Sequence, residues 1–289
     1  MSKLYLIVGA SGTVGSNIAS GLLRSGARVR GITSKAVSAR ASNPGDGIEW
    51  VQADLSSGTG VKEAFEGVDR AFLLSPPGYA DQHRVLSPLI AEAARRQLEK
   101  VVLMTAMGAD ANPESPMRRA ELELERSGLR YNIIRPNWFM QNFHTFWLQG
   151  LREQRKILLP AGRARVSFID SRDISAVAQK LLESGGDDGL SNQAFVLTGP
   201  EAIDHDQVAD ALSVATGLPI RYQEIEPKVL GDGMRAAGVP GDYVDFLLLI
   251  LGYLREGYSS GTTDSVRRIL GREPTDIHRY ARDFAKAWA

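Results

Sequence analysis

A short apolar segment near the N-terminus runs directly into a turn with three evenly spaced glycines. Residues 4–8 (LYLIV) have the composition of a buried β-strand, residues 9–15 (GASGTVG) form the turn, and residues 16–23 carry apolar side chains at helical spacing. Strand, glycine turn and helix in this order are typical of the first unit of a dinucleotide-binding domain. The reason is that the phosphates must meet backbone N–H groups at a helix N-terminus.

The three glycines each have a physical task in such a turn. Gly9 permits the tight turn off the strand, Gly12 lets the backbone approach a pyrophosphate, and Gly15 lets the helix pack close to the sheet. An ordinary glycine-rich loop is the alternative, but the position between strand and helix favours the phosphate cradle. The predicted cradle residues, which include two hydroxyl donors, are Gly9, Ser11, Gly12, Thr13, Val14 and Gly15.

The segment after this unit contains cations and no carboxylate. NAD sites commonly carry Asp or Glu about 20 residues after the glycine turn to bind the ribose hydroxyls, whereas the first carboxylate of this chain is Asp46. The second predicted strand, residues 29–33, instead ends among hydroxyls and cations that suit a 2′-phosphate. The sequence therefore favours NADP over NAD, with solvated surface cations as the alternative. The candidate ligands are Thr33, Ser34, Lys35 and Arg40.

Length and composition limit the class of protein. A chain of 289 residues that is 43% hydrophobic can bury the core of one large domain with a smaller appendage. The 34 basic and 34 acidic residues balance, so there is no general electrostatic case for binding nucleic acid or an anionic membrane. Cysteine is absent, which excludes disulfides and fits a reducing cytoplasm. We expect a cytoplasmic monomer or homodimer whose partner is a small-molecule substrate.

Apolar stretches long enough for a membrane span or a signal peptide are not visible. The N-terminal apolar run is short and enters a glycine turn, and the longest later run, residues 246–254, falls far short of the ~20 residues that cross a bilayer. The sequence therefore predicts a soluble protein.

Strand and helix patterns alternate through the first half of the chain. Such alternation predicts an α/β fold with a doubly wound parallel sheet of Rossmann type and a smaller α+β C-terminal lobe. We expect residues 1–150 to form the NADP-binding domain, with residues 165–198 returning to it, and residues 151–164 and 199–289 to form the substrate lobe. The predicted strands are residues 4–8, 29–33, 49–52, 70–74, 100–105 and 131–135, and the helical patterns lie after the first turn and around residues 61–65, 85–97 and 120–127.

A doubly wound sheet binds its ligand at the carboxyl ends of its strands. After the third strand we assign Asp54, next to Leu55, to the adenine amino group, with a helix cap or turn as the alternative role. The segment after the fourth strand is expected to line the ribose and nicotinamide half. The fifth and sixth strands lead into further cofactor candidates. These strand-end candidates are Ser75, Pro76, Pro77, Thr105, Pro136, Asn137, Trp138 and Phe139.

The substrate pocket is predicted just after the sixth strand. The amide of Asn137 is expected to face the nicotinamide, and His144 is a candidate general acid. The aromatic rings of this segment either wall the pocket or pack the core of the lobe, and its two amides either orient substrate or satisfy local backbone. The substrate candidates are Trp138, Gln141, Asn142, Phe143 and Phe146, with Trp147 as a further wall, and the catalytic candidates are Thr105, Asn137 and His144.

Five stretches together resemble the NmrA-like, atypical branch of the short-chain dehydrogenase/reductase superfamily. They are residues 9–15, residues 135–143 (RPNWFMQNF), residues 168–174 (FIDSRDI), residues 195–200 (FVLTGP) and residues 271–274 (GREP). The resemblance implies an NADP-binding Rossmann domain, a smaller C-terminal lobe and a substrate cleft between them. Members of the family include quinone and iminium reductases, and also redox-sensing regulators without known turnover.

The chain departs from the superfamily at its proton-transfer residues. Most members carry a Tyr-x-x-x-Lys pair, but residues 115–123 (SPMRRAELE), where the pair would lie, contain neither residue, and Thr105 takes the place of the usual serine. Reduction of a ketone gains strongly from a positioned acid, whereas a quinone or an iminium acceptor is less demanding. We therefore expect hydride transfer from NADPH to an electron-poor, fairly apolar acceptor such as a quinone, enone or imine. The alternative is a non-catalytic NADP(H)-sensing regulator of the NmrA type.

The remaining motifs have mainly structural interpretations. Residues 170–173 are expected to cap a helix, with a cofactor contact as the alternative. The sequence pattern predicts two helices, at residues 204–212 and 242–256, and it predicts a strand at residues 220–225. The second of these helices is a candidate lid or subunit contact, and Tyr253 and Tyr258 near it are candidate proton donors.

Metal binding is not expected. The four histidines are far apart in the sequence and show no ligand spacing, so each is expected at the surface, at a helix cap or in a pocket. They are His83, His144, His205 and His278.

Overall fold

The computed structural model describes residues 2–34, 47–185 and 189–288. The chain divides into two compact units, which we call unit 1 (Met1–Arg135 and Ile174–Val196) and unit 2 (Pro136–Asp173 and Leu197–Ala289). No helix in the described ranges is long and apolar enough to cross a bilayer.

Unit 1 alternates strands and helices as the sequence predicts. Its elements are β1 (Leu4–Ile7), α1 (Gly15–Arg24), β2 (Arg28–Thr33), β3 (Ile48–Gln52), α3 (Val61–Ala64), β4 (Arg70–Leu74), α4 (Gln82–Arg95), β5 (Lys100–Met104), the 3₁₀ turn η1 (Ala109–Ala111) and α5 (Pro116–Arg126). Three further elements contribute residues to both units, namely β6 (Tyr131–Pro136), α7 (Ser171–Glu183) and β8 (Gln193–Leu197).

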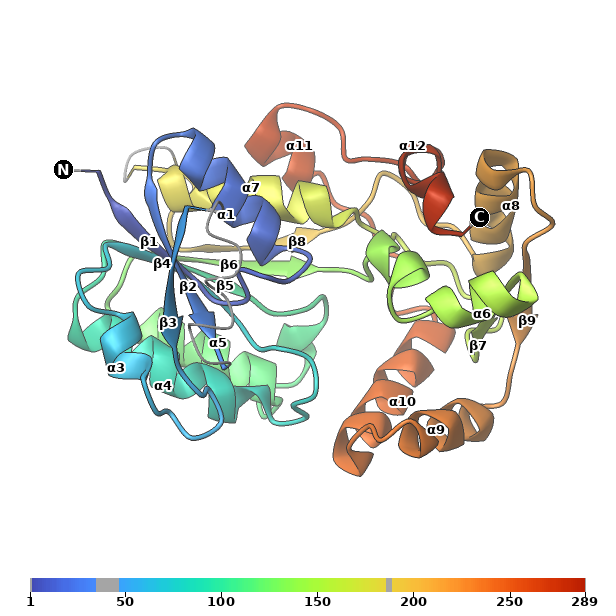
Figure 1. Cartoon of the computed structure of the whole chain (residues 1–289), viewed down its shortest axis with the longest axis horizontal. Helices are drawn as coiled ribbons and strands as arrows, with labels where there is room; N and C mark the ends of the chain where they lie inside the picture. Colours follow the sequence, from blue (N-terminus) through green and yellow to red (C-terminus); the bar gives the residue numbers. More distant parts are fainter. Residues whose placement is uncertain (1, 35–46, 186–188, 289) are drawn as a thin grey trace. The chain divides into compact units, whose positions relative to one another are not determined.

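The central sheet has the order β3-β2-β1-β4-β5-β6-β8, and the strands from β1 to β6 pair in parallel. Within unit 1, α1 and α7 cover one face of the sheet, and α3, α4 and α5 cover the other (Figure 1). This is the doubly wound α/β fold, so the predicted fold class is confirmed. The strand order reverses between β1 and β4, and a crevice for ligands forms at such a switch point.

The core of unit 1 explains why its strands are nearly continuous runs of apolar residues. A parallel sheet covered by helices on both faces buries every side chain of its inner strands. All four residues of β1 are buried, and Leu6 and Leu73 pack with Leu89 of α4 and Leu124 of α5 in one cluster. The sheet is therefore a rigid support for the loops at its carboxyl edge.

Unit 2 holds a small two-stranded parallel sheet, in which Lys156 of β7 pairs with Arg221 of β9. The expected helix near residues 204–212 is present and begins with a capping box between Asp204 and Gln207. The elements of unit 2 are the 3₁₀ turn η2 (Met140–His144), α6 (Leu148–Gln154), β7 (Lys156–Leu159), α8 (His205–Thr216), β9 (Arg221–Glu224), α9 (Pro227–Ala236), α10 (Gly241–Arg255), α11 (Ser265–Leu270), α12 (Ile277–Phe284) and the 3₁₀ turn η3 (Ala285–Ala287).

The segment after β6 groups with unit 2, whereas the sequence places residues 136–150 in the Rossmann domain. Met140 and Phe143 of this segment are buried in one apolar cluster with Phe168 and Leu212. Apolar burial, which contributes about 1.5–3 kcal/mol for a large side chain, therefore attaches this segment to the smaller unit.

Candidate functional site

The glycine turn after β1 has the geometry of an anion cradle. Gly9 has φ of +75°, a backbone conformation that favours glycine. A Cβ on Gly15 would lie 2.2 Å from the carbonyl oxygen of Gly9, so the first residue of α1 must be glycine for the turn to close on itself. We expected Gly15 to serve helix packing on the sheet, but the close neighbour is the backbone of the turn.

The start of α1 leaves backbone donors for a ligand. Its N-cap, Val14, makes no side-chain capping bond. Within the part of the chain that the structure describes, the N–H groups of Thr13 and Val14 have no acceptor, and Ser11, Gly12 and Thr13 are exposed. Unsatisfied N–H groups at a helix N-terminus attract phosphate. These residues therefore fit the pyrophosphate of a dinucleotide.

Ser175 of α7 supports this cradle. Its hydroxyl donates a hydrogen bond of 3.0 Å to the carbonyl oxygen of Val14, and the residue is 3% exposed. No pattern in the sequence indicates this contact. The two residues are 161 positions apart, and a serine inside a helix carries no local signal of such a role.

The residues that we predict for the 2′-phosphate are only partly described. Thr33 is buried at the end of β2, and Ser34 after it is exposed. Lys35 and Arg40 lie outside the described residues. Arg30, a cation in the same strand, is tied to the carboxylate of Glu49 and to two backbone carbonyls, so it serves the fold.

The loops after β3 and β4 lie at the same edge of the sheet as the glycine turn. Asp54 is exposed, and its carboxylate accepts hydrogen bonds from the backbone and hydroxyl of Ser56 and from the hydroxyl of Ser57. These bonds, those of Ser56 first, hold the pKa of Asp54 below its usual range. Asp54 thus closes a turn, which was our alternative for it, and the adenine contact stays a prediction.

The other residues of these two loops pack partly into unit 1. Leu55 is half-buried against the core of the unit. The hydroxyl of Ser75 donates to the carbonyl oxygen of Pro76, both residues are half-buried, and Pro77 is exposed. Their expected contacts with the cofactor also stay predictions.

Thr105, which follows β5, takes part in a buried ionic cluster. Its hydroxyl oxygen lies 2.6 Å from the carboxylate of Glu121 on α5. The same carboxylate is held by the Nε and Nη2 atoms of Arg135, at 2.9 and 2.7 Å, and by Arg118 at 2.8 Å. The side chains of Thr105 and Arg135 are almost fully buried and Glu121 is fully buried. The hydroxyl at the place of the superfamily's serine is therefore already engaged.

Asn137 also has its polar groups engaged within unit 2. Its Nδ2 donates to the hydroxyl of Ser167 at 2.7 Å and to the carbonyl oxygen of Ser259 at 2.8 Å, and its Oδ1 accepts the N–H of Trp138. Both amide hydrogens are thus used inside the chain. Pro136 before it is buried, and Trp138 and Phe139 are half-buried.

The predicted pocket aromatics have different environments in unit 2. Phe143 is fully buried, with its ring centroid 4.9 Å from that of Trp147 and 5.3 Å from that of Phe168. Trp138 is half-buried, while Phe146 is 71% exposed. Phe143 therefore packs the core of unit 2.

His144 is half-buried in the same unit. Its Nδ1 lies 2.7 Å from the hydroxyl of Tyr280, and its ring stacks on Phe284 at 4.5 Å. Burial lowers the pKa of His144 and raises that of Tyr280. Both groups are therefore neutral near pH 7, so His144 has no extra proton to give as an imidazolium acid.

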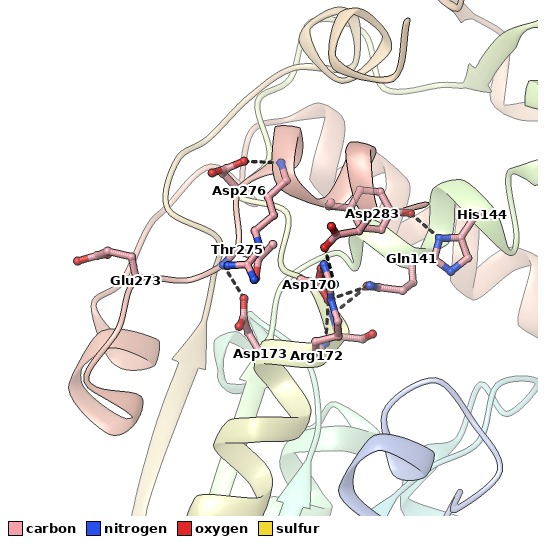
Figure 2. Close-up of polar contacts among 12 residues, drawn as sticks. Gln141, His144, Asp170, Arg172, Asp173, Glu273, Thr275, Asp276 and Asp283 are labelled. Carbon is pink, nitrogen blue, oxygen red and sulfur yellow. Dashed lines mark hydrogen bonds and ion pairs between the residues drawn. The ribbon is translucent and has the colours of Figure 1, made fainter. Parts of the chain in front are cut away.

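The motif at residues 170–173 secures the C-terminal segment of unit 2 (Figure 2). Asp170 accepts hydrogen bonds from Gln141 and from the backbone and guanidinium of Arg172, and Arg172 also binds Asp283. Asp173, fully buried, accepts the N–H of Thr275 at 2.6 Å and pairs with Arg272. Asp170 meets backbone at the start of α7, while Asp173 reaches the C-terminal segment.

The other polar candidates have local roles or are exposed. The Nε2 of Gln141 donates to Asp170 and its Oε1 accepts the N–H of Ser171, so this amide is used. Asn142 is half-buried, and its carbonyl oxygen accepts the N–H of Trp147. Tyr253 and Tyr258 are exposed. Among the described residues, no group of three or more His, Cys, Asp or Glu side chains is arranged to hold a metal ion.

A doubly wound sheet whose first glycine turn opens onto an uncapped helix defines a dinucleotide-binding α/β protein. Residues 9–183 match the model of a family described as NAD(P)H-binding. The chain belongs to this NAD(P)H-binding family. It shares its fold with NmrA, a negative transcriptional regulator solved in complex with NAD, with a TM-score of 0.75 at 16% identity over 99% of this chain and 96% of that one.

Two curated relatives match over nearly the whole chain. The chain is 30% identical over 291 residues to the NAD(P)H azoreductase of Xenophilus azovorans, covering 99% of each chain. It is 31% identical over 284 residues to the uncharacterised oxidoreductase YesF of Bacillus subtilis, covering 98% of this chain and 96% of that one. The crystal structure of the Citrobacter sp. triphenylmethane reductase complexed with NADP(H) shares the fold, with a TM-score of 0.82 at 19% identity over 99% of this chain and 100% of that one.

Proposed function

We propose that the chain is an NADPH-dependent reductase that passes hydride to a small, electron-poor, largely apolar acceptor such as a quinone, an enone or an imine. The observation that carries this proposal is the engaged hydroxyl of Thr105, bound to the carboxylate of Glu121, on a chain whose helix α5 has neither tyrosine nor lysine. Reduction of a plain ketone builds negative charge on oxygen and needs a positioned donor. Acceptors that by themselves stabilise the added electron pair do not need such a donor.

The relatives support the same chemical class. The azoreductase is named for azo compounds and the triphenylmethane reductase for triphenylmethane dyes, and both kinds of acceptor are conjugated and electron-poor. In this proposal the bound nicotinamide supplies the hydride. The chain contributes the cradle at residues 9–15, which holds the pyrophosphate, and a fixed geometry for the acceptor.

The cofactor of the proposal is NADPH. No carboxylate precedes Asp46 in the chain, so none lies directly at the end of β2 to bind the ribose hydroxyls as in an NAD site. Ser34 is exposed at the end of β2, and Lys35 and Arg40 follow in the sequence. These hydroxyl and cationic groups suit a 2′-phosphate.

The test is anaerobic NADPH consumption with a matched panel of quinones, enones, cyclic imines, azo dyes and plain ketones. We expect turnover with several electron-poor acceptors and little with plain ketones. A marked preference for plain ketones would contradict the proposal. Tight NADP(H) binding without turnover of any acceptor would instead favour the regulatory, NADP(H)-sensing alternative.

A further inference from the structure

The buried cluster around Glu121 fixes the direction in which the hydrogen of the Thr105 hydroxyl points. Helix α5 begins at the sequence Ser115-Pro116, where the Ser115 hydroxyl accepts the N–H of Arg118, and this start places Glu121 one turn further on with no exposed surface. The Glu121 carboxylate meets Thr105, two nitrogens of Arg135 and one of Arg118, all within 2.6 to 2.9 Å.

Glu121 is ionised in this cluster. Burial raises the pKa of its carboxyl, but hydrogen bonds from Arg135, Thr105 and Arg118 outweigh burial and hold the pKa below its ordinary value. An ionised carboxylate only accepts hydrogen bonds, so the single hydrogen of the Thr105 hydroxyl must point to Glu121. The Thr105 oxygen therefore keeps lone pairs to offer and no hydrogen.

We propose that Glu121 is a positioning residue that makes Thr105 an acceptor-only group, so that the site selects acceptors with an N–H beside the reacting carbon, such as protonated imines. Thr105 directly follows β5 at the ligand-binding edge of the sheet and is 7% exposed. This inference rests on the proposed function. It assigns the contact that distinguishes one acceptor class from another.

The hydrogen bond between the imine N–H and Thr105 acts mainly on the binding of the acceptor. The imine N–H donates to Thr105 both before and after hydride adds to the imine carbon, when the π electron pair moves to nitrogen and cancels its charge. No proton donor is needed. Because the bond is strongest to the cationic form, it lowers KM for the N–H acceptor more than it raises kcat.

The probes are a protonated cyclic imine and the N-methyl iminium salt of the same ring, which carry the same charge and differ in the N–H. Calorimetry with the oxidised cofactor bound measures binding without turnover, at a pH below the pKa of the imine. We expect the protein to bind the N–H probe about tenfold or more tightly than the N-methyl probe, as for a hydrogen bond with a charged partner. KM with NADPH should show the same ratio, with little change in kcat.

Two variants of the cluster separate the roles. Thr105→Val removes the oxygen and should bring the binding ratio of the two probes close to one. Glu121→Gln places an amide N–H toward Thr105, so the hydroxyl turns and becomes a donor. The Glu121→Gln variant should therefore lose the preference for the N–H probe. Its turnover of carbonyl acceptors should rise relative to its turnover of imines.

Glu123→Gln is the matched control. It removes one charge from the same helix, where Glu123 contacts His83 and Ser87, and should keep the wild-type ratio. If the thermal melt shows that Glu121→Gln does not fold, the binding ratio of Thr105→Val still decides whether Thr105 accepts the N–H of the probe.

A wild-type ratio near one, or a Thr105→Val ratio equal to wild type, would overturn the inference. So would a loss of NADPH affinity in Thr105→Val with both probes weakened equally, since Thr105 would then contact the cofactor. Absence of NADPH turnover with every acceptor would count against the proposed function alone, because the calorimetric ratio does not depend on turnover.

Discussion

His205 begins α8 as a fully buried residue among aromatic rings. Its ring centroid lies 5.2 Å from that of Tyr222 and 5.5 Å from that of Phe168. Neither ring nitrogen has a hydrogen-bond partner among the described residues. Burial lowers the pKa of His205 to about 4. We expected the histidines at a surface, a cap or a pocket, and His205 instead packs as a neutral ring in the core of unit 2.

This burial makes stability depend on pH. Between pH 6.5 and about 4 the unfolded chain takes up a proton on His205 that the folded chain does not bind. The stability that depends on the neutral ring is therefore complete above pH 6.5 and is lost as the pH falls toward 4, by about 3 kcal/mol.

Urea unfolding across this pH range tests the prediction. His205→Leu should show a flatter dependence of the unfolding free energy on pH than the wild type. The exposed His278 offers the matched control, and His278→Leu should keep the wild-type slope. An unchanged slope in His205→Leu would contradict the assignment.

Single residues also show what a sequence pattern leaves open. The sequence marked Thr105 and Asn137 as polar groups at strand ends, and both lie there. Their hydrogen-bond partners are 16 and up to 122 positions away. A pattern of residue types cannot show that a hydroxyl or an amide is already used, because that depends on tertiary contacts.

At the scale of elements, the start of α7 holds the end of unit 2 in place. Asp173 binds the backbone of Thr275 just before α12 and pairs with Arg272, while Arg172 binds Asp283 within α12 (Figure 2). From the sequence we expected residues 170–173 to cap a helix. The contacts of this motif with residues 102 and 111 positions further on appear only in the folded chain.

We expect Asp173→Asn to loosen the C-terminal segment. The amide oxygen can still accept the N–H of Thr275, but the ion pair with the half-exposed Arg272 is lost. The free energy of unfolding should fall by about 1–3 kcal/mol, because one buried charged acceptor is weakened. Hydrogen exchange of residues 275–288 should be faster than in wild type.

The control for this prediction is the exposed pair of Asp264 and Arg267, 4.0 Å apart. Asp264→Asn should alter stability by less than about 0.5 kcal/mol. Equal exchange rates in Asp173→Asn and wild type would show that the apolar packing of α12 alone holds the segment.

At the scale of the whole molecule, cofactor binding should appear as stability. A ligand that binds only the folded chain stabilises it by about 2.7 kcal/mol at 100 times its Kd. We expect NADP⁺ to raise the melting temperature more than NAD⁺ at equal concentration. The double variant Lys35→Ala with Arg40→Ala should abolish this difference, and high salt should reduce it.

A double variant at two exposed cations elsewhere in unit 1, Lys62→Ala with Arg130→Ala, serves as control and should keep the preference for NADP⁺. Equal stabilisation of the wild type by both cofactors would contradict the assignment. The oligomeric state, monomer or homodimer, stays a prediction that light scattering can test in the same samples.

The sequence by itself determined the doubly wound sheet and the glycine turn after its first strand, because both depend on local patterns: apolar runs of strand length and glycines at fixed spacing. Only the tertiary structure decided which polar groups remain available. In the folded chain the hydroxyl of Thr105 is hydrogen-bonded to Glu121, and both amide hydrogens of Asn137 are donated within the chain. Phe143 and His205 are fully buried. Hydrogen-bond partners and burial are set by residues distant in sequence, so no local pattern contains them.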